Sequence, residues 1–235
     1  MGRINTAMLI SAITCLIAAV GFMFPWAIAH FGETTETATA YGVTVVVTLE
    51  PYDAYITGLG MGGAEPEGEA TISGFPYSFD VNVDVDFAHN MGYIGVIGLA
   101  MNIIAFVLIL VASLASSPAV GRITGYLGFA FLAIGLSLGL SYLGVLWAGL
   151  GKVEGEGEVG IDVPGYGTVK VEEDLEADLS ELIEDAEAVY PGYGFILALV
   201  MWVISVASFV KGMLAMRTAI PPPAPAPAGL PEAAS

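Results

Sequence analysis

Basic side chains are scarce in this sequence. Only six Lys and Arg residues stand against 24 Asp and Glu residues in a chain of 235, and the formal net charge is −18. Binding to a nucleic-acid backbone requires clustered Lys and Arg side chains that neutralise phosphates. The composition therefore argues against nucleic acid as a partner.

Cysteine and charge of either sign are also sparse. The single cysteine, Cys15, excludes an intramolecular disulfide framework and any metal site built from several cysteines. Charged residues make up 13% of the chain and hydrophobic residues 56%, whereas a soluble domain carries about 25% charged residues. The composition argues against an ordinary soluble globular protein.

Long apolar stretches account for this imbalance. Four of them contain no Asp, Glu, Lys or Arg, and they cover residues 7–31, 91–117, 123–151 and 192–210. Each exceeds the ~18 residues at which a membrane-spanning helix becomes the better interpretation than a buried soluble helix. Because backbone groups in lipid must be satisfied within the segment, uninterrupted apolar runs of this kind predict helices.

The sequence thus predicts a membrane all-α four-helix transmembrane bundle with a small extracytoplasmic β-rich cap, α+β overall. The predicted segments are a first transmembrane helix with a short N-terminus (1–30), an acidic β-rich loop (31–90), a second helix (91–117), a turn (118–122), a third helix (123–151), an acidic hairpin with an amphipathic helix (152–191), a fourth helix (192–215) and a Pro/Ala-rich tail (216–235).

The few basic residues predict the orientation. Arg3, Arg122, Lys211 and Arg217 all fall on one side of the predicted spans, and the side richer in Lys and Arg is normally cytoplasmic. We therefore expect a multi-pass protein of the plasma membrane with both termini in the cytoplasm.

The two predicted outer loops carry almost all of the acidic residues. Residues 31–90 contain ten acids and no Lys or Arg, and residues 152–191 contain 13 acids and two lysines. In residues 79–87, Phe and Val alternate with Asp and Asn, which predicts a strand with one apolar and one acidic face. Residues 152–159 alternate similarly and predict a hairpin with residues 168–171, whereas residues 172–190 carry the apolar spacing of an amphipathic helix ended by Pro191.

This layout, with its larger loop first, is similar in outline to the four-span organisation of claudins, and more loosely to that of tetraspanins. The characteristic loop residues of those families are Trp and Cys, and neither outer loop here contains them. The resemblance therefore implies a shared topology and assigns no family.

Five residues within the predicted spans or at the start of one are candidates for contacts between helices. Asn102 lies near the middle of the second span, and an amide there typically bonds across helices. The third span contains small residues four positions apart, which allow close approach of helices within the bundle or between subunits. The glycines concerned are Gly121, Gly125, Gly135 and Gly139.

Carboxylates and two histidines are the candidate metal ligands. Asp80, Asp84 and Asp86 share one face of the predicted strand and, with Glu154, Glu156 and Glu158, could attract a divalent cation. Carboxylates along one strand lie about 7 Å apart, however, which favours a solvated acidic face. His30 and His89 bracket the first loop and could form a copper or zinc pair, although interfacial packing is the simpler interpretation. We predict no cofactor.

These features favour a structural, assembly or accessory subunit that acts through an acidic outer cap. Its expected partners are the lipid bilayer, other membrane subunits or a second copy, and a cationic molecule outside the cell. The alternative is a channel or cation-handling subunit whose pore is lined by Asn102, Ser137 and Ser141. No nucleophile-and-base motif is present, so we do not expect an enzyme.

Overall fold

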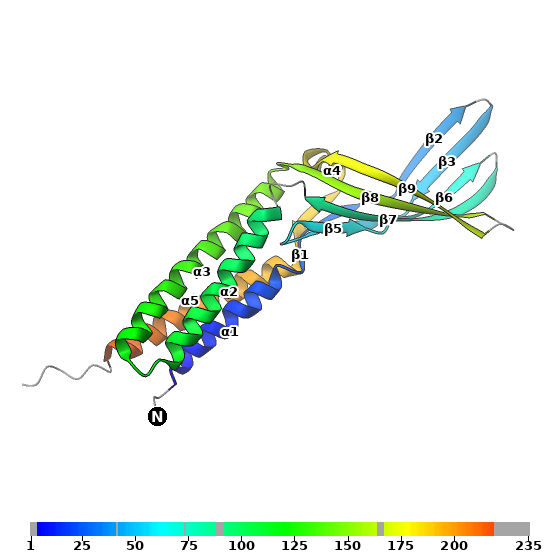
Figure 1. Cartoon of the computed structure of the whole chain (residues 1–235). Helices are drawn as coiled ribbons and strands as arrows, with labels where there is room; N and C mark the ends of the chain where they lie inside the picture. Colours follow the sequence, from blue (N-terminus) through cyan, green and yellow to red (C-terminus); the bar gives the residue numbers. More distant parts are fainter. Residues whose placement is uncertain (1–3, 41, 73, 88–91, 164–166, 219–235) are drawn as a thin grey trace, which may run out of the picture.

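The computed structural model describes residues 4–40, 42–72, 74–87, 92–163 and 167–218. Helices form a bundle, and strands form a sheet that extends from one end of it (Figure 1). In chain order the elements are α1 (Thr6–Gly21), β1 (Pro25–Phe31), β2 (Thr34–Ala40), β3 (Val43–Leu49), β4 (Tyr52–Thr57), β5 (Met61–Ala64), β6 (Glu67–Ile72), β7 (Phe75–Phe87), α2 (Gly92–Leu114), α3 (Pro118–Trp147), β8 (Lys152–Val163), β9 (Gly167–Asp178), α4 (Leu179–Asp185), β10 (Ala188–Pro191) and α5 (Tyr193–Thr218).

Among the described residues, three helices are long and apolar enough to cross a membrane, namely α2, α3 and α5. The sequence predicts four such helices, and this prediction is wrong for the first. Helix α1 has 16 residues, which is a length of about 24 Å at 1.5 Å per residue, whereas a hydrocarbon core measures about 30 Å. Helix α1 packs against α2 and α5 within the bundle.

The end of the first apolar run explains this difference. Residues 25–31 form strand β1 instead of continuing the helix, and β1 pairs on one side with β4 and on the other with β10. Both partners come from segments far along the chain, and they satisfy the backbone groups that a continued helix would have bonded internally. Hydropathy alone cannot separate a buried strand from the end of a buried helix.

The prediction of a small cap is also wrong. The strands of the described residues make up about a third of the chain, and all ten of them belong to one antiparallel sheet. The sheet is large because the two acidic loops merge: β7 of the first loop pairs with β8 of the second over residues 79–87. The molecule is therefore a helix bundle joined to a sheet of comparable extent (Figure 1).

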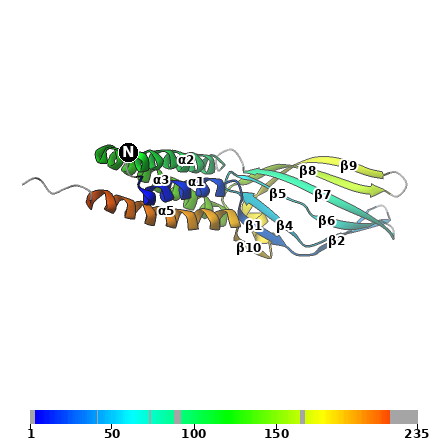
Figure 2. The ribbon, with the colours of Figure 1, turned by 90° about the horizontal axis from the view of Figure 1, so that it is seen from below.

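Strand β7 has 13 residues and divides the sheet into two branches. Its first half pairs with β6, which leads to β3 and β2 at the far tip. Its second half pairs with β5, which leads to β4, β1 and β10 beside the bundle. The β8–β9 hairpin runs along the other edge of β7 (Figure 2).

A hairpin forms in the second acidic loop, but its register differs from the prediction: residues 168–171 pair with 159–162, and residues 152–158 pair with 172–178. The segment predicted as a long amphipathic helix therefore begins as a strand. Strand β9 continues to Asp178, which pairs with Lys152 at the start of β8. Only the seven residues of α4 are helical, and β10 follows and ends at Pro191. Helix α4 thus connects β9, the outer strand of the β8–β9 hairpin, to β10, the outer strand of the branch beside the bundle.

An aromatic cluster joins the bundle to the sheet. The indole of Trp26 lies against Phe22, Tyr142 and Trp202, with ring centroids 4.5, 5.7 and 6.3 Å away. Trp26 donates its Nε1 hydrogen to the carbonyl of Gly21, and the Tyr142 hydroxyl donates to the carbonyl of Thr57. All four rings are fully buried or nearly so, which fixes the base of the sheet on the helices.

Candidate functional site

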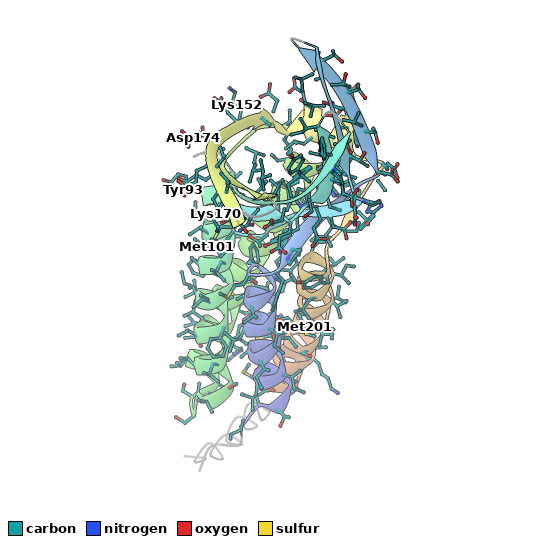
Figure 3. The ribbon with its side chains drawn as sticks, turned by 90° about the vertical axis from the view of Figure 1, so that its right-hand side faces the viewer. Tyr93, Met101, Lys152, Lys170, Asp174 and Met201 are labelled. Atoms are coloured by element: carbon teal, nitrogen blue, oxygen red, sulfur yellow. The ribbon has the colours of Figure 1, made fainter. Side chains whose placement is uncertain are left out.

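The sheet has two chemically different faces. Along β7, Phe79, Val81 and Val83 are partly buried, while Asp80 and Asp84 are exposed. This alternation continues on the neighbouring strands, so the acidic side chains cover one face and the apolar side chains the other. Where the sheet curves beside the bundle, the apolar face is the concave one. Lys152, Lys170 and Asp174 lie on the outer, convex side of the curved sheet (Figure 3).

On the outer face, acidic residues lie directly opposite one another across three strands. Asp84 pairs with Glu156, and Glu156 pairs with Asp174, so three exposed acids form one row. In the next row Glu158 pairs with Glu172. Like charges directly opposite in an antiparallel sheet are destabilising, so the arrangement opposes folding unless positive charge is nearby.

Two lysines supply part of that positive charge. Lys152 bonds Glu176 at 2.5 Å, and Lys170 bonds Glu158. The hydrogen bond and the charge of Glu176 raise the pKa of Lys152, and the reciprocal bond lowers the pKa of Glu176. Both pairs are exposed. Among the described residues, no basic side chain forms an ion pair with Asp84, Glu156 or Asp174.

The structure places the carboxylate candidates in separate positions along the strands. Asp80 lies opposite Gly160, Asp84 opposite Glu156 and Asp86 opposite Glu154. Within the described segments, no group of three His, Cys, Asp or Glu side chains lies close enough to hold a metal ion.

Only one of the two histidine candidates lies in the described part of the chain. His30 lies on β1, and its Nδ1 is 2.8 Å from Oδ1 of Asp53 on the adjacent strand β4. His89 lies outside the residues that the structure describes. A carboxylate therefore occupies the side of the His30 ring that faces β4.

Asn102 lies in the bundle interior with both ends of its amide bonded. Its Oδ1 accepts the Nε1 hydrogen of Trp202 at 2.7 Å, and its Nδ2 donates to the carbonyl of Gly98 at 2.8 Å. Ser137 and Ser141, by contrast, lie exposed on α3. The three residues therefore do not face a common channel.

The four candidate glycines, Gly121, Gly125, Gly135 and Gly139, are all buried on the side of α3 that faces the bundle. A methyl group added at Gly135 would lie 2.7 Å from Nδ2 of Asn102, and one at Gly139 would lie 2.6 Å from the Trp202 ring. At Gly121 and Gly125 the nearest atoms would be the carbonyl of Ala112 and the Met8 side chain, 3.3 and 3.0 Å away. Their contacts lie within one chain.

Beneath the concave face lies an apolar cavity of about 310 Å³. The three alanines Ala29, Ala54 and Ala64 line it from β1, β4 and β5. Pairing places them side by side in one row that continues to Val83 on β7 and Val189 on β10. The cavity exists because the middle of this row carries only methyl groups.

Larger groups enclose the cavity at its ends. The rings of Phe31 and Tyr52 stack with centroids 4.9 Å apart, Leu182 and Ile183 cover it from α4, and Leu146 at the last turn of α3 forms part of its base. Burial, followed by the charge of Asp185, raises the pKa of the Tyr52 hydroxyl. The walls can therefore hold an apolar molecule between the sheet and the bundle.

Sequence reasoning missed this cavity. Ala29 falls in the first predicted helix, Ala54 falls in a predicted strand of the acidic β-rich loop, and Ala64 falls in a Gly- and Pro-rich turn region of that loop. The available signal is the alternation of Ala27, Ala29 and Phe31 with larger or polar neighbours, but the cavity itself depends on the register between strands. A comparison of the chain with protein-family models, curated proteins and solved structures finds no match.

Proposed function

We propose that the protein is a membrane-anchored structural or accessory subunit that binds a cationic partner through the outer face of its sheet. The observation that supports this function is the row of Asp84, Glu156 and Asp174 in direct cross-strand register. Their mutual repulsion costs stability in the isolated protein. A positively charged partner would offset that cost, and the negative field would raise the rate of encounter.

The distribution of charge along the molecule supports an orientation. Arg122 lies in the first turns of α3, and Lys211 and Arg217 lie in the last turns of α5. These helix ends are at the end of the bundle opposite the sheet (Figure 1). With α2, α3 and α5 crossing the membrane, the positive-inside rule places this end in the cytoplasm. In this proposal the sheet projects from the outer surface of the plasma membrane, and α1, although shorter than a full span, passes through the bundle alongside α2 and α5. Both termini are then cytoplasmic, and the protein catalyses no reaction.

The experiment compares partners recovered from native membranes with three forms of the full-length protein after mild cross-linking. One variant carries Asp84→Asn, Glu156→Gln and Asp174→Asn. The matched control removes the same charge from acids outside the row, with Glu33→Gln, Glu36→Gln and Glu50→Gln. We expect the wild type and the control to recover one basic partner in a fixed ratio, and the row variant to lose it at least tenfold.

Recovery of the same proteins with all three forms would contradict the proposal, as would recovery of none. Increasing the salt concentration provides a second measurement, because binding to an exposed charged surface weakens as the Debye length shortens. A partner that remains bound equally at about 1 M salt, where the Debye length is about 3 Å, is not held by this surface.

A further inference from the structure

We propose that the cavity beneath the concave face binds an unbranched aliphatic chain whose head group is neutral or positively charged. This inference does not depend on the proposed function of the outer face. It assigns a ligand to a cavity that the bundle and the sheet form together.

The size and lining of the cavity indicate an apolar ligand. A volume of about 310 Å³ lies at the lower end of the range for small-molecule sites, roughly 300–1,000 Å³. The strands contribute mainly Ala, Val and Ile side chains, and the rings of Phe31 and Tyr52 close one side. Cavities with such walls hold little ordered water and accept apolar molecules.

The position of the cavity indicates an aliphatic chain. Leu146 forms part of its base and belongs to the last turn of α3, one of the helices apolar enough to cross a membrane. Leu182 and Ile183 cover it from α4, a helix of seven residues between the free edges of β9 and β10. The cavity therefore lies where the helices end, next to the hydrocarbon chains of a bilayer.

The charge around the cavity restricts the head group. Glu176 lines the cavity and is paired with Lys152, and the charge of Asp185, which has no ion-pair partner among the described residues, acts on Tyr52 at the cavity wall. The acidic outer face surrounds this site. An anionic head group would be repelled, whereas an amine or an alcohol would not.

The test uses full-length protein in lipid nanodiscs and photoreactive probes with a diazirine at the chain end. The probes are a dodecylamine, a carboxylic acid of the same length, and a phospholipid that carries the diazirine in its acyl chain. Mass spectrometry locates the labelled residues. We expect the amine or the phospholipid to label peptides containing Phe31, Tyr52 or Leu182, and the acid to label them at least fivefold less than the amine.

Two variants fill the cavity from neighbouring strands, Ala54→Phe and Ala29→Phe, with Ala54→Leu as a smaller change in case a ring prevents folding. Ala38→Phe on the exposed strand β2 is the matched control. Filling should reduce labelling of the sheet at least tenfold, and the control should leave it unchanged. Labelling by the phospholipid identifies a membrane lipid as the source, and labelling by the amine alone identifies a free amphiphile.

Several results would overturn the inference. Labelling of the sheet that Ala54→Phe, Ala29→Phe and Ala54→Leu all leave intact excludes the cavity as the site. Labelling of the helices alone excludes it as well. Stronger labelling by the acid than by the amine contradicts the predicted head-group charge.

Discussion

The helix bundle and the sheet differ in how completely the chain itself fills space and pairs polar groups. In the bundle, glycines fit against neighbouring atoms, and the buried amide of Asn102 is bonded at both ends. The sheet contains a cavity on one face and opposed carboxylates on the other. The bundle is thus stabilised by contacts within the chain, whereas the cavity and the opposed carboxylates of the sheet are two features that a second molecule could stabilise.

Gly95→Ala should have the largest effect, because it acts where the two regions meet. The added methyl carbon would lie 1.8 Å from the backbone carbonyl oxygen of Gly58, so α2 or the β4–β5 turn must move. We expect the free energy of unfolding to fall by about 3 kcal/mol or more. Gly144→Ala on α3 is the matched control because nothing lies within 4 Å of its added methyl group. Thermal unfolding in nanodiscs measures the stability of both variants. Equal losses of stability would contradict the close contact between α2 and the β4–β5 turn.

Asn102→Leu tests the cohesion of the bundle itself. The substitution leaves the buried Nε1 hydrogen of Trp202 without its acceptor, which should cost about 1–3 kcal/mol. Trp202→Phe removes the other partner, and a double-mutant cycle isolates the interaction between them. Additive losses in the double variant would show that the hydrogen bond contributes no coupling energy.

Ala54→Leu should raise the free energy of unfolding, whereas the two substitutions described above should lower it. The added carbons enter the cavity instead of meeting packed atoms, and cavity filling commonly stabilises by about 0.5–2 kcal/mol. We therefore expect a higher unfolding temperature in delipidated protein. A lower unfolding temperature would show that the cavity wall cannot accept a larger side chain, and Ala38→Leu on β2 reports the effect of added apolar surface alone.

Neutralising the outer row should stabilise the sheet by a smaller amount. Asp84→Asn with Asp174→Asn removes the repulsion on both sides of Glu156, and each cross-strand pair is worth about 0.2–1 kcal/mol. The gain should shrink as salt screens the charges. Glu33→Gln with Glu36→Gln is the matched control, because it makes the same change in net charge outside the row. A loss of stability at low salt in the row variant would contradict the repulsion.

The smallest effect concerns acid sensitivity at the Lys152–Glu176 pair. Because the pKa of Glu176 is lowered in the folded state, the pair stabilises above the unfolded carboxyl pKa of about 4.3. That contribution disappears as the pH falls through the lower folded value. Unfolding temperatures between about pH 3 and pH 6 should show a slightly weaker dependence for Glu176→Gln than for Glu181→Gln. Identical profiles would show that the pair contributes nothing.

Periodicity in the sequence predicted local features of the fold with some success. The alternation of residues 79–87 predicted a strand, which lies within β7. An acidic hairpin also forms, although residues 152–158 pair with 172–178 instead of with the predicted partner 168–171. Uncharged runs predicted α2, α3 and α5, the three helices long and apolar enough to cross a membrane. In each of these segments, neighbours along the chain carry the pattern that determines the element.

The remaining features depend on partners distant in sequence. Pro25–Phe31 is a strand because β4 and β10 pair with it, and Asp178 ends a strand because Lys152 lies opposite. The row of Ala29, Ala54 and Ala64 becomes a cavity wall only once the register is set. Hydropathy over a window of residues contains none of this information.

The pairing of β1 with β10 has a consequence for synthesis of the chain. Strand β1 ends at Phe31, but one of its edges is paired only when residues 188–191 have been made. Helix α1 likewise packs against α5, the last helix. Chain elongation proceeds at about 5–20 residues per second, so the nascent protein keeps an open strand edge for many seconds. Such an edge can pair with other chains, and the completed C-terminal segment is what ends this exposure.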